Sequence, residues 1–272
     1  MGLRVNTNVA ALTSQRNLGA VTGRLQGNFA RLSSGLRIAT AADDAAGLGI
    51  SERMRAEVRS FTVAGRNAQD GVSLVQTAEG ALQEVSNNLT RMRELAVQAS
   101  NGTLTAQDRA TLDTEFQALV TEIDRVSSQT TFNGVNLLDG TTTSLSVQVG
   151  TDAGESIALS LSDTTSTGLS IGSADVTTAA NAANALSTID TAIDSVSTAR
   201  GTLGASQNRL TSALSSILNP RENLSAAESR IRDVDVAIET ADLTRNSILQ
   251  QAAVSVLSQA NVQPQLALSL LG

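Results

Sequence analysis

An apolar stripe with helical spacing runs through the first half of this chain and constrains its fold more than any other feature. Its members are Met54, Val58, Phe61, Ala68, Val72, Val75, Leu82, Val85, Leu89, Met92, Ala96 and Ala99. Nearly all steps are three or four residues, or sums of these, as in an amphipathic helix. A helix over residues 44–100 would be roughly 84 Å long at 1.5 Å per residue. Since globular domains rarely hold such a helix, the stripe predicts a coiled bundle.

Three further helical patterns follow. Asn101-Gly102 is expected to end the long helix with a left-handed glycine cap, and Thr105 with Asp108 resembles an N-cap box. That box opens a shorter helix that carries Leu112, Phe116, Leu119, Ile123 and Val126. In the second half, an apolar three-four alternation runs over 186–224. A capping box at Ser225 and Glu228 is then expected to start a last helix through residue 252.

Between the two halves, the apolar period changes from helical to alternating. Leu145, Val147 and Val149 alternate with polar residues, and Ile157, Leu159 and Leu161 do the same after a turn-rich stretch. This pattern predicts a β-hairpin at about 144–162, followed by a loop over 162–181. The predicted fold class is mainly α: a long antiparallel helical rod or coiled-coil bundle with a small β-hairpin at its distal end and both termini at the same end.

The composition excludes several classes of function. The 272-residue chain contains no Cys, His, Trp, Tyr or Lys, and all 19 basic residues are Arg. It therefore lacks an imidazole base, a thiolate and a Schiff-base amine, so we expect neither an enzyme nor a metal site or cofactor. Scattered Arg and a net charge of −7 argue against a nucleic-acid partner. The chain shows no long apolar run, so we expect no membrane span and no cleaved secretory signal.

The stretch 248–262 is apolar around most of a helical circumference. Such a helix needs more than one neighbour to bury it, and the N-terminal stretch supplies a single apolar stripe. Either the two ends form an intramolecular two-helix coiled coil, or other copies of the chain complete the burial. The breadth of the apolar surface favours the second alternative.

Asp43 and Asp44 raise a separate question, because adjacent carboxylates could belong to a catalytic or metal-binding loop. Neighbouring residues on a helix project about 100° apart, so the two groups cannot converge on one proton or ion. We expect both to lie at the positive N-terminal end of the long helix. Gly35 is expected to let the chain change direction before the long helix. The stretch that holds Gly35, Asp43 and Asp44 is therefore interpreted as a joint and not as a catalytic or metal-binding loop.

The chain resembles bacterial flagellins in many blocks and in order. The matching blocks are VNTNVAAL (5–12), RLSSGLRI (31–38), DDAAGLGIS (43–51), RNAQDGVSLVQTAEGAL (66–82), RMRELAVQASN (91–101), EIDRVSSQTTFNGVNLLDG (122–140), LGASQNRL (203–210), SRIRDVD (229–235) and the stretch 248–272. A short hairpin stands where larger flagellins have variable outer domains.

The resemblance implies a structural subunit of the flagellar filament, an extracellular homopolymer required for motility. It implies a division into residues 1–43 (inner coiled coil and spoke), 44–227 (rod and hairpin) and 228–272 (inner coiled coil). Implied partners are other copies, the filament cap, hook–filament junction proteins, an export chaperone and the type III export apparatus. The alternative is a hook–filament junction protein, which would share the terminal blocks; a lipid-binding amphipathic protein would need Lys or Arg flanks and interfacial aromatics that are absent.

The resemblance also assigns candidate sites. The spoke is assigned to Gly35, Asp43 and Asp44. Arg91, Leu95 and Gln98 share one helical face, which would otherwise be taken as a solvated surface. With Glu115, these positions match the motif by which flagellins engage an innate-immune Toll-like receptor of the host. The residues expected to assemble the inner coiled coil are Val5, Val9, Leu12, Leu25, Phe29, Leu32, Ile231, Val234, Ile238, Ile248, Leu249, Val256 and Leu257.

Overall fold

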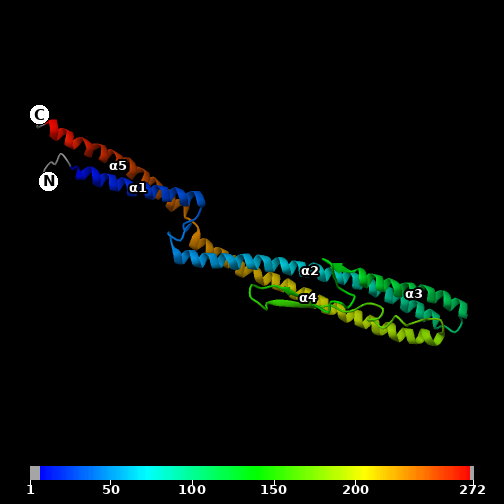
Figure 1. Cartoon of the computed structure of the whole chain (residues 1–272). Helices are drawn as coiled ribbons and strands as arrows, with labels where there is room; N and C mark the ends of the chain where they lie inside the picture. The colour runs from blue at the N-terminus through cyan, green and yellow to red at the C-terminus, as the bar shows by residue number, and fades with distance from the viewer. Residues whose placement is uncertain (1–6, 270–272) are drawn as a thin grey trace. The chain divides into compact units, whose positions relative to one another are not determined.

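The computed structural model describes residues 7–269, with side chains through residue 262. It contains five helices, whose bounds are α1 Val9–Ser34, α2 Ala45–Ala99, α3 Ala106–Gln129, α4 Ala179–Arg232 and α5 Val236–Ser269 (Figure 1). The contacts divide the chain into a terminal unit, residues up to 56 with residues from 223 onward, and a central unit, 57–222. The mainly α class and the long helix predicted over 44–100 are confirmed.

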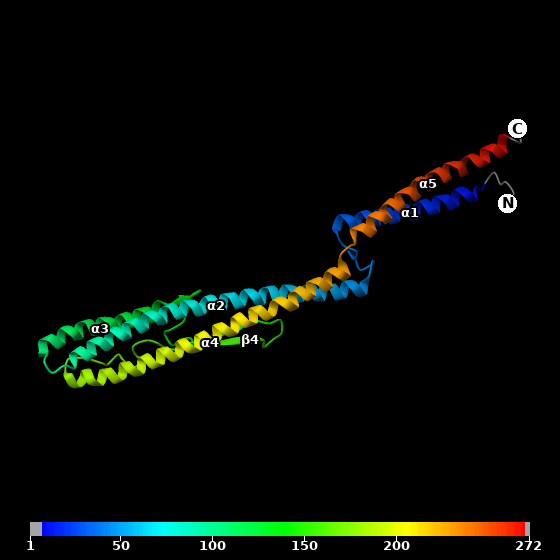
Figure 2. The ribbon, with the colours of Figure 1, turned by 180° about the vertical axis from the view of Figure 1, so that it is seen from behind.

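The central unit is built along one hydrophobic core. Within this unit α2, α3 and α4 lie side by side (Figures 1 and 2), because each carries an apolar stripe with helical spacing toward the others. Its largest fully buried side chains include Leu82, Leu89, Met92, Phe116, Ile123 and Ile189.

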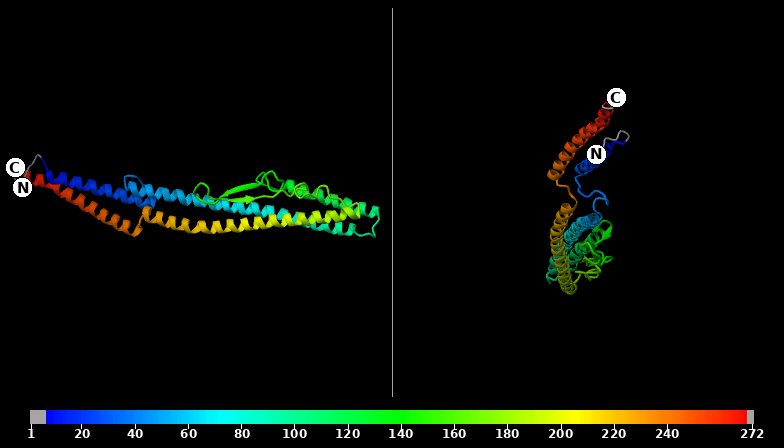
Figure 3. Two further views of the ribbon diagram at one scale, coloured as in Figure 1. Left: turned by 90° about the horizontal axis from the view of Figure 1, so that it is seen from below. Right: turned by 90° about the vertical axis from the view of Figure 1, so that its left-hand side faces the viewer.

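The predicted hairpin is present and packs beside these helices (Figure 3). Strands β3, Ser144–Gln148, and β4, Ser156–Ser160, pair antiparallel with Leu145 opposite Leu159. The alternation buries Val147, Ile157 and Leu159. The side-chain amide of Asn67 on α2 donates to the carbonyl of Gln148 at 3.2 Å, which fixes the hairpin against that helix.

A smaller hairpin precedes it. Strands β1, Thr131–Phe132, and β2, Val135–Asn136, are joined by Asn133 and Gly134, with φ of 48° and 78°. Two consecutive positive φ values are what a tight hairpin turn demands, and Asn-Gly adopts them at low cost.

Residues 163–178 form an irregular segment, here called the strap, that packs against α3. Its Leu169, Ile171 and Val176 are buried. Four α3 side chains bond only to its backbone or hydroxyl groups. The bonds join Asp113 to the amide of Val176, Gln117 to the carbonyl of Ala174, Asp124 to the amide of Ser166 and Ser127 to the carbonyl of Thr164. The predicted loop is therefore a packed part of the core.

Helix ends follow the sequence predictions at one place and depart from them at another. The Thr105–Asp108 capping box is confirmed, with the Thr105 amide 2.9 Å from the Asp108 carboxylate. Gly102 does not adopt the expected positive φ. The Arg109 guanidinium instead donates to the carbonyls of Ala99 at 2.8 Å and Asn101 at 2.9 Å. A cation thus satisfies the free carbonyls at the end of α2.

The capping box expected at Ser225 and Glu228 is wrong. Helix α4 continues past both residues to Arg232, even with Pro220 inside it. Within a helix the amide groups already have carbonyl partners four residues back, so a serine there has none to cap. The helical conformation is interrupted at residues 233–235, between α4 and α5. The Asp235 carboxylate accepts hydrogen bonds from the amides of Ala237 and Ile238 at the start of α5.

Asp-X-Thr motifs recur in the non-helical segments of the central unit. The carboxylates of Asp139 and Asp175 each accept from the amide and the hydroxyl of the threonine two residues later. These bonds favour the charged carboxylate, and the threonine side chains lower the pKa of both groups from 3.8.

We predict that acid weakens the central unit through these carboxylates. Because their pKa is lower in the folded state, the unfolded chain takes up protons first as the pH falls. Their contribution is complete above the ordinary pKa and is lost as the pH drops through the lowered one. Circular dichroism melts between neutral pH and about pH 2 should show a falling Tm, with a smaller fall in Asp139→Asn. A Tm independent of pH over this range would contradict the prediction.

No helix among the described residues combines the length and apolarity that a membrane crossing requires.

Candidate functional site

The terminal unit is an antiparallel pair of α1 and α5, which lie side by side (Figures 1 and 2). Partly buried side chains, spaced by three or four residues or by sums of these, line the seam between them: Leu18, Val21 and Leu25 on α1, and Leu243, Ala253 and Leu257 on α5. At the end of the seam where α1 begins, the side-chain amide of Asn8 donates to the carbonyl of Ala260 of α5 at 2.7 Å. The same Asn8 accepts from the amide of Ala11 and so caps α1.

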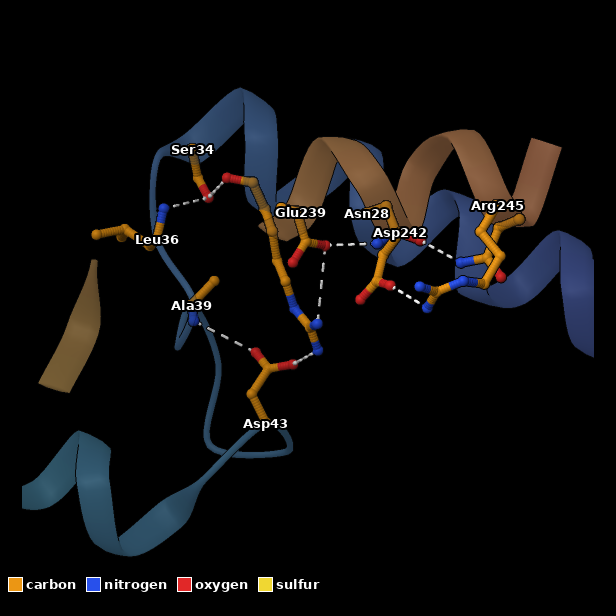
Figure 4. Close-up of polar contacts among 10 residues, drawn as sticks. Asn28, Ser34, Leu36, Ala39, Asp43, Glu239, Asp242 and Arg245 are labelled. Atoms are coloured by element: carbon orange, nitrogen blue, oxygen red, sulfur yellow. Dashed lines mark hydrogen bonds and ion pairs between the residues drawn. The ribbon is translucent and has the colours of Figure 1, made fainter. Parts of the chain in front are cut away.

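Three polar side chains interrupt this apolar seam. Asn28 of α1 faces Glu239 of α5 (Figure 4) and also bonds to Asn246 of α5; the three are 6%, 7% and 9% exposed, respectively. The Asn28 amide nitrogen donates to Glu239 at 2.6 Å, and the Asn28 oxygen accepts from Asn246 at 2.8 Å. The sequence prediction missed this cluster because an isolated Asn in an apolar stripe gives no sign of its partner.

The connector, residues 35–44, leads from α1 to α2. Gly35 adopts a left-handed conformation with φ of 71°, and its amide donates to the carbonyl of Arg31. The connector then lies against the break between α4 and α5: the Arg37 amide donates to the carbonyl of Arg232 at 2.7 Å, and the Val234 amide to that of Gly35 at 3.0 Å. Ile38 is buried there. Gly35 thus ends α1 in a left-handed conformation that glycine adopts without steric cost.

Asp43 and Asp44 do different things. Asp44 accepts from the amide of Gly47 at 2.9 Å and caps α2, as predicted. Asp43 points instead into the connector, where it accepts from Thr40 and lies 3.8 Å from the Arg31 guanidinium (Figure 4). The expectation that both carboxylates meet the end of the helix is wrong for Asp43. Its bonds to Thr40 lower its pKa.

The outer sides of α1 and α5 expose many large apolar side chains, here called the apolar surface. Its members are Val9, Leu12, Phe29, Val236, Ile238, Ile248, Leu249, Val254, Val256 and Val262. Monomeric proteins rarely expose contiguous apolar patches beyond a few hundred Å².

The predicted assembly residues fall into two groups. Val9, Leu12, Phe29, Ile238, Ile248, Leu249 and Val256 belong to the apolar surface. Leu25, Leu32, Ile231, Val234 and Leu257 are half-buried within the terminal unit. Val5 lies outside the described residues.

Three residues of the predicted receptor motif are exposed and the fourth is buried. Arg91, Gln98 and Glu115 are exposed, and the Arg91 guanidinium lies 2.9 Å from Glu115 and from Glu94. The hydrogen bond with Glu115 raises the pKa of Arg91. Leu95 is only 1% exposed and belongs to the core. Its expected place on the exposed face with Arg91 is wrong, because its side chain packs into the hydrophobic core of the central unit.

No group of three or more Asp and Glu side chains in the described part of the chain is arranged to hold a metal ion.

Comparisons with known proteins agree with this architecture. The bacterial flagellin N-terminal helical region matches residues 5–143, and the flagellin C-terminal helical region matches residues 186–271. A flagellin of Halalkalibacterium halodurans is 50% identical over 98% of this chain and 99% of its own. The crystal structure of Bacillus cereus flagellin is 36% identical, with a TM-score of 0.52 over 60% of this chain and 94% of its own.

A putative flagellar hook-associated protein from Vibrio parahaemolyticus also has a similar fold. Its TM-score is 0.60 over 70% of this chain and 100% of its own, at 17% identity. At 17% identity, this match is evidence of a similar fold alone. The matches to the two flagellin regions and to the relative at 50% identity are matches in sequence. The chain belongs to the bacterial flagellin family.

Proposed function

We propose that this chain is a structural subunit of the bacterial flagellar filament, which polymerises outside the cell. The observation that carries the proposal is the apolar surface of α1 and α5, whose side chains are left exposed by the described residues of the terminal unit. Burying it against further copies would be favourable at roughly 25 cal/mol per Å². Homopolymerisation provides such copies on every side, because a head-to-tail contact that does not close generates a helical polymer.

In this proposal the terminal helices line the inner tube of the filament, and the central unit forms the next shell outward. The functional division is then 1–43, 44–227 and 228–272, with the connector as the spoke. The proposed route of export is the flagellar type III apparatus, without a cleaved signal. The other proposed partners are an export chaperone, the filament cap and the hook–filament junction proteins.

Electron microscopy of the concentrated protein tests the proposal. Long helical filaments that depolymerise on dilution or heating are expected. Short ring-like stubs would favour the alternative, a hook–filament junction protein, and monodisperse particles at all concentrations would contradict both. The 50% identity to a flagellin over nearly the whole chain favours the filament subunit.

We also propose that the monomer is a ligand for the innate-immune Toll-like receptor of flagellin. Arg91 and Gln98 are exposed on α2, and Glu115 is exposed beside them on α3, so three of the four motif residues are available to a partner. Leu95 takes part by supporting α2 from within the core.

Arg91→Ala is predicted to weaken receptor activation by at least about tenfold, because a central interface arginine commonly contributes 2 kcal/mol or more. Arg93→Ala is the matched control: Arg93 is equally exposed on the same helix and pairs with Asp190. Dose–response curves in receptor-reporter cells should separate the two variants, while circular dichroism shows both folded. Equal potency of Arg91→Ala and wild type would remove Arg91 from the site.

A further inference from the structure

We infer that Asn101–Gly102, in the turn between α2 and α3, is a site of spontaneous deamidation, and that Arg109 promotes the reaction. Gly102 has no positive φ, and a Cβ placed on it would meet no atom beyond its chain neighbours within 4 Å. Neither backbone conformation nor packing therefore requires glycine here. What glycine supplies instead is a main-chain nitrogen that no side chain of its own shields.

Deamidation is an attack of the chain on itself. The Gly102 nitrogen gives its proton to hydroxide and forms a bond to Cγ of Asn101, and the side-chain nitrogen of Asn101 leaves as ammonia. Water then opens the resulting succinimide ring at either of its two carbonyl groups. The products are aspartate, or isoaspartate in which the main chain passes through the former side-chain carbonyl. Either product carries one more negative charge than asparagine.

The turn leaves the attacking nitrogen free. In the described part of the chain, the Gly102 amide donates no hydrogen bond, and both Asn101 and Gly102 are exposed. The neighbouring amides are occupied: that of Asn101 donates to the carbonyl of Gln98, and that of Thr103 to Oδ1 of Asn101. The amide proton that the reaction must remove is thus open to solvent.

Hydrogen-bond donors lie at both oxygens that gain negative charge. When Gly102 loses its proton, the charge spreads to the carbonyl oxygen of the same peptide group, which is that of Asn101. The Arg109 guanidinium donates to this oxygen at 2.9 Å and is itself held by the carbonyl of Ala99 at 2.8 Å. Attack on Cγ then moves charge to Oδ1, where the Thr103 amide donates at 3.2 Å. Donors fixed where charge develops lower a reaction barrier.

The chain contains a second Asn-Gly pair, which serves as an internal comparison. Gly134 has a φ of 78°, so the β1–β2 turn does require glycine. No group in the described part of the chain donates to the main-chain carbonyl or the side-chain oxygen of Asn133. The residues are the same at both sites, and the donors are present only around Asn101.

Peptide mapping of the intact folded chain after incubation in mildly alkaline buffer measures both rates. Cleavage at arginine releases residues 94–109, in which Asn101 is the single asparagine. Asn101 should convert at least about tenfold faster than Asn133, because a hydrogen bond from a charged donor readily supplies the corresponding barrier difference. In chain unfolded by urea, which lacks these donors, the two sites should convert at similar rates.

Two variants separate the parts of the inference. Gly102→Ala shields the attacking nitrogen and should nearly abolish conversion at position 101, with an unchanged circular dichroism spectrum. Arg109→Gln should slow conversion of Asn101 about tenfold and leave that of Asn133 unchanged, whereas a general loosening of the fold would alter both sites. Equal rates at the two sites in the folded chain, or undiminished conversion in Gly102→Ala, would overturn the site. An unchanged rate in Arg109→Gln would overturn the role of Arg109.

Discussion

Val256→Asp is expected to raise the concentration required for polymerisation at least about a hundredfold, or to abolish it, while the monomer stays folded. Val256 is 57% exposed on α5, so the charge disturbs little within the subunit. Once neighbouring copies cover it, the carboxylate has no partner, at a cost of several kcal/mol per subunit. About 3 kcal/mol already corresponds to more than a hundredfold in affinity.

The matched control is Gln251→Glu, which adds the same charge to an exposed polar position of the same helix. Sedimentation and electron microscopy should find filaments for this control and none for Val256→Asp. Leu257→Asp would be less informative, because Leu257 is half-buried in the terminal unit and its loss would disturb the subunit as well. Normal filaments from Val256→Asp would show that this part of the apolar surface remains solvated after assembly.

Phe116→Ala should have the largest effect on the stability of the central unit. Phe116 is fully buried and the largest side chain in the core between the helices. Truncating a buried phenylalanine removes its transfer free energy and leaves a cavity, at a cost of about 3–5 kcal/mol. For a unit of this size, the Tm should fall by about 10 °C.

Urea titrations and thermal melts followed by circular dichroism measure this effect. Val97→Ala is the control: Val97 is 51% exposed on α2, and surface changes usually stay within about 0.5 kcal/mol. If both variants had the same stability, the core assignment of α3 would be wrong.

The features predicted correctly from the sequence are those with local signals. The long helix, the β3–β4 hairpin and the Thr105–Asp108 cap each follow from spacing or residue type over a few positions. The apolar excess of α5 likewise predicted an exposed surface, because a helix that is apolar on most sides exceeds what one neighbour can cover.

The features that were missed depend on contacts between distant segments. The burial of Leu95 is an example, because the sequence of α2 does not indicate which distant segments pack against each of its faces. The Asn28–Glu239 contact joins residues 211 positions apart, and no local pattern indicates it. The Ser225–Glu228 pattern failed for a related reason: the same residues fit both the start and the interior of a helix.

The strap has a consequence for which sequence changes the chain can tolerate. The α3 side chains bond to its main chain at Thr164, Ser166, Ala174 and Val176. Main-chain groups are the same for almost every amino acid, so exposed strap positions can drift in identity with little loss. A single inserted or deleted residue between these anchor points would displace several of the bonds together. Length, more than composition, is therefore the inherited constraint on this segment.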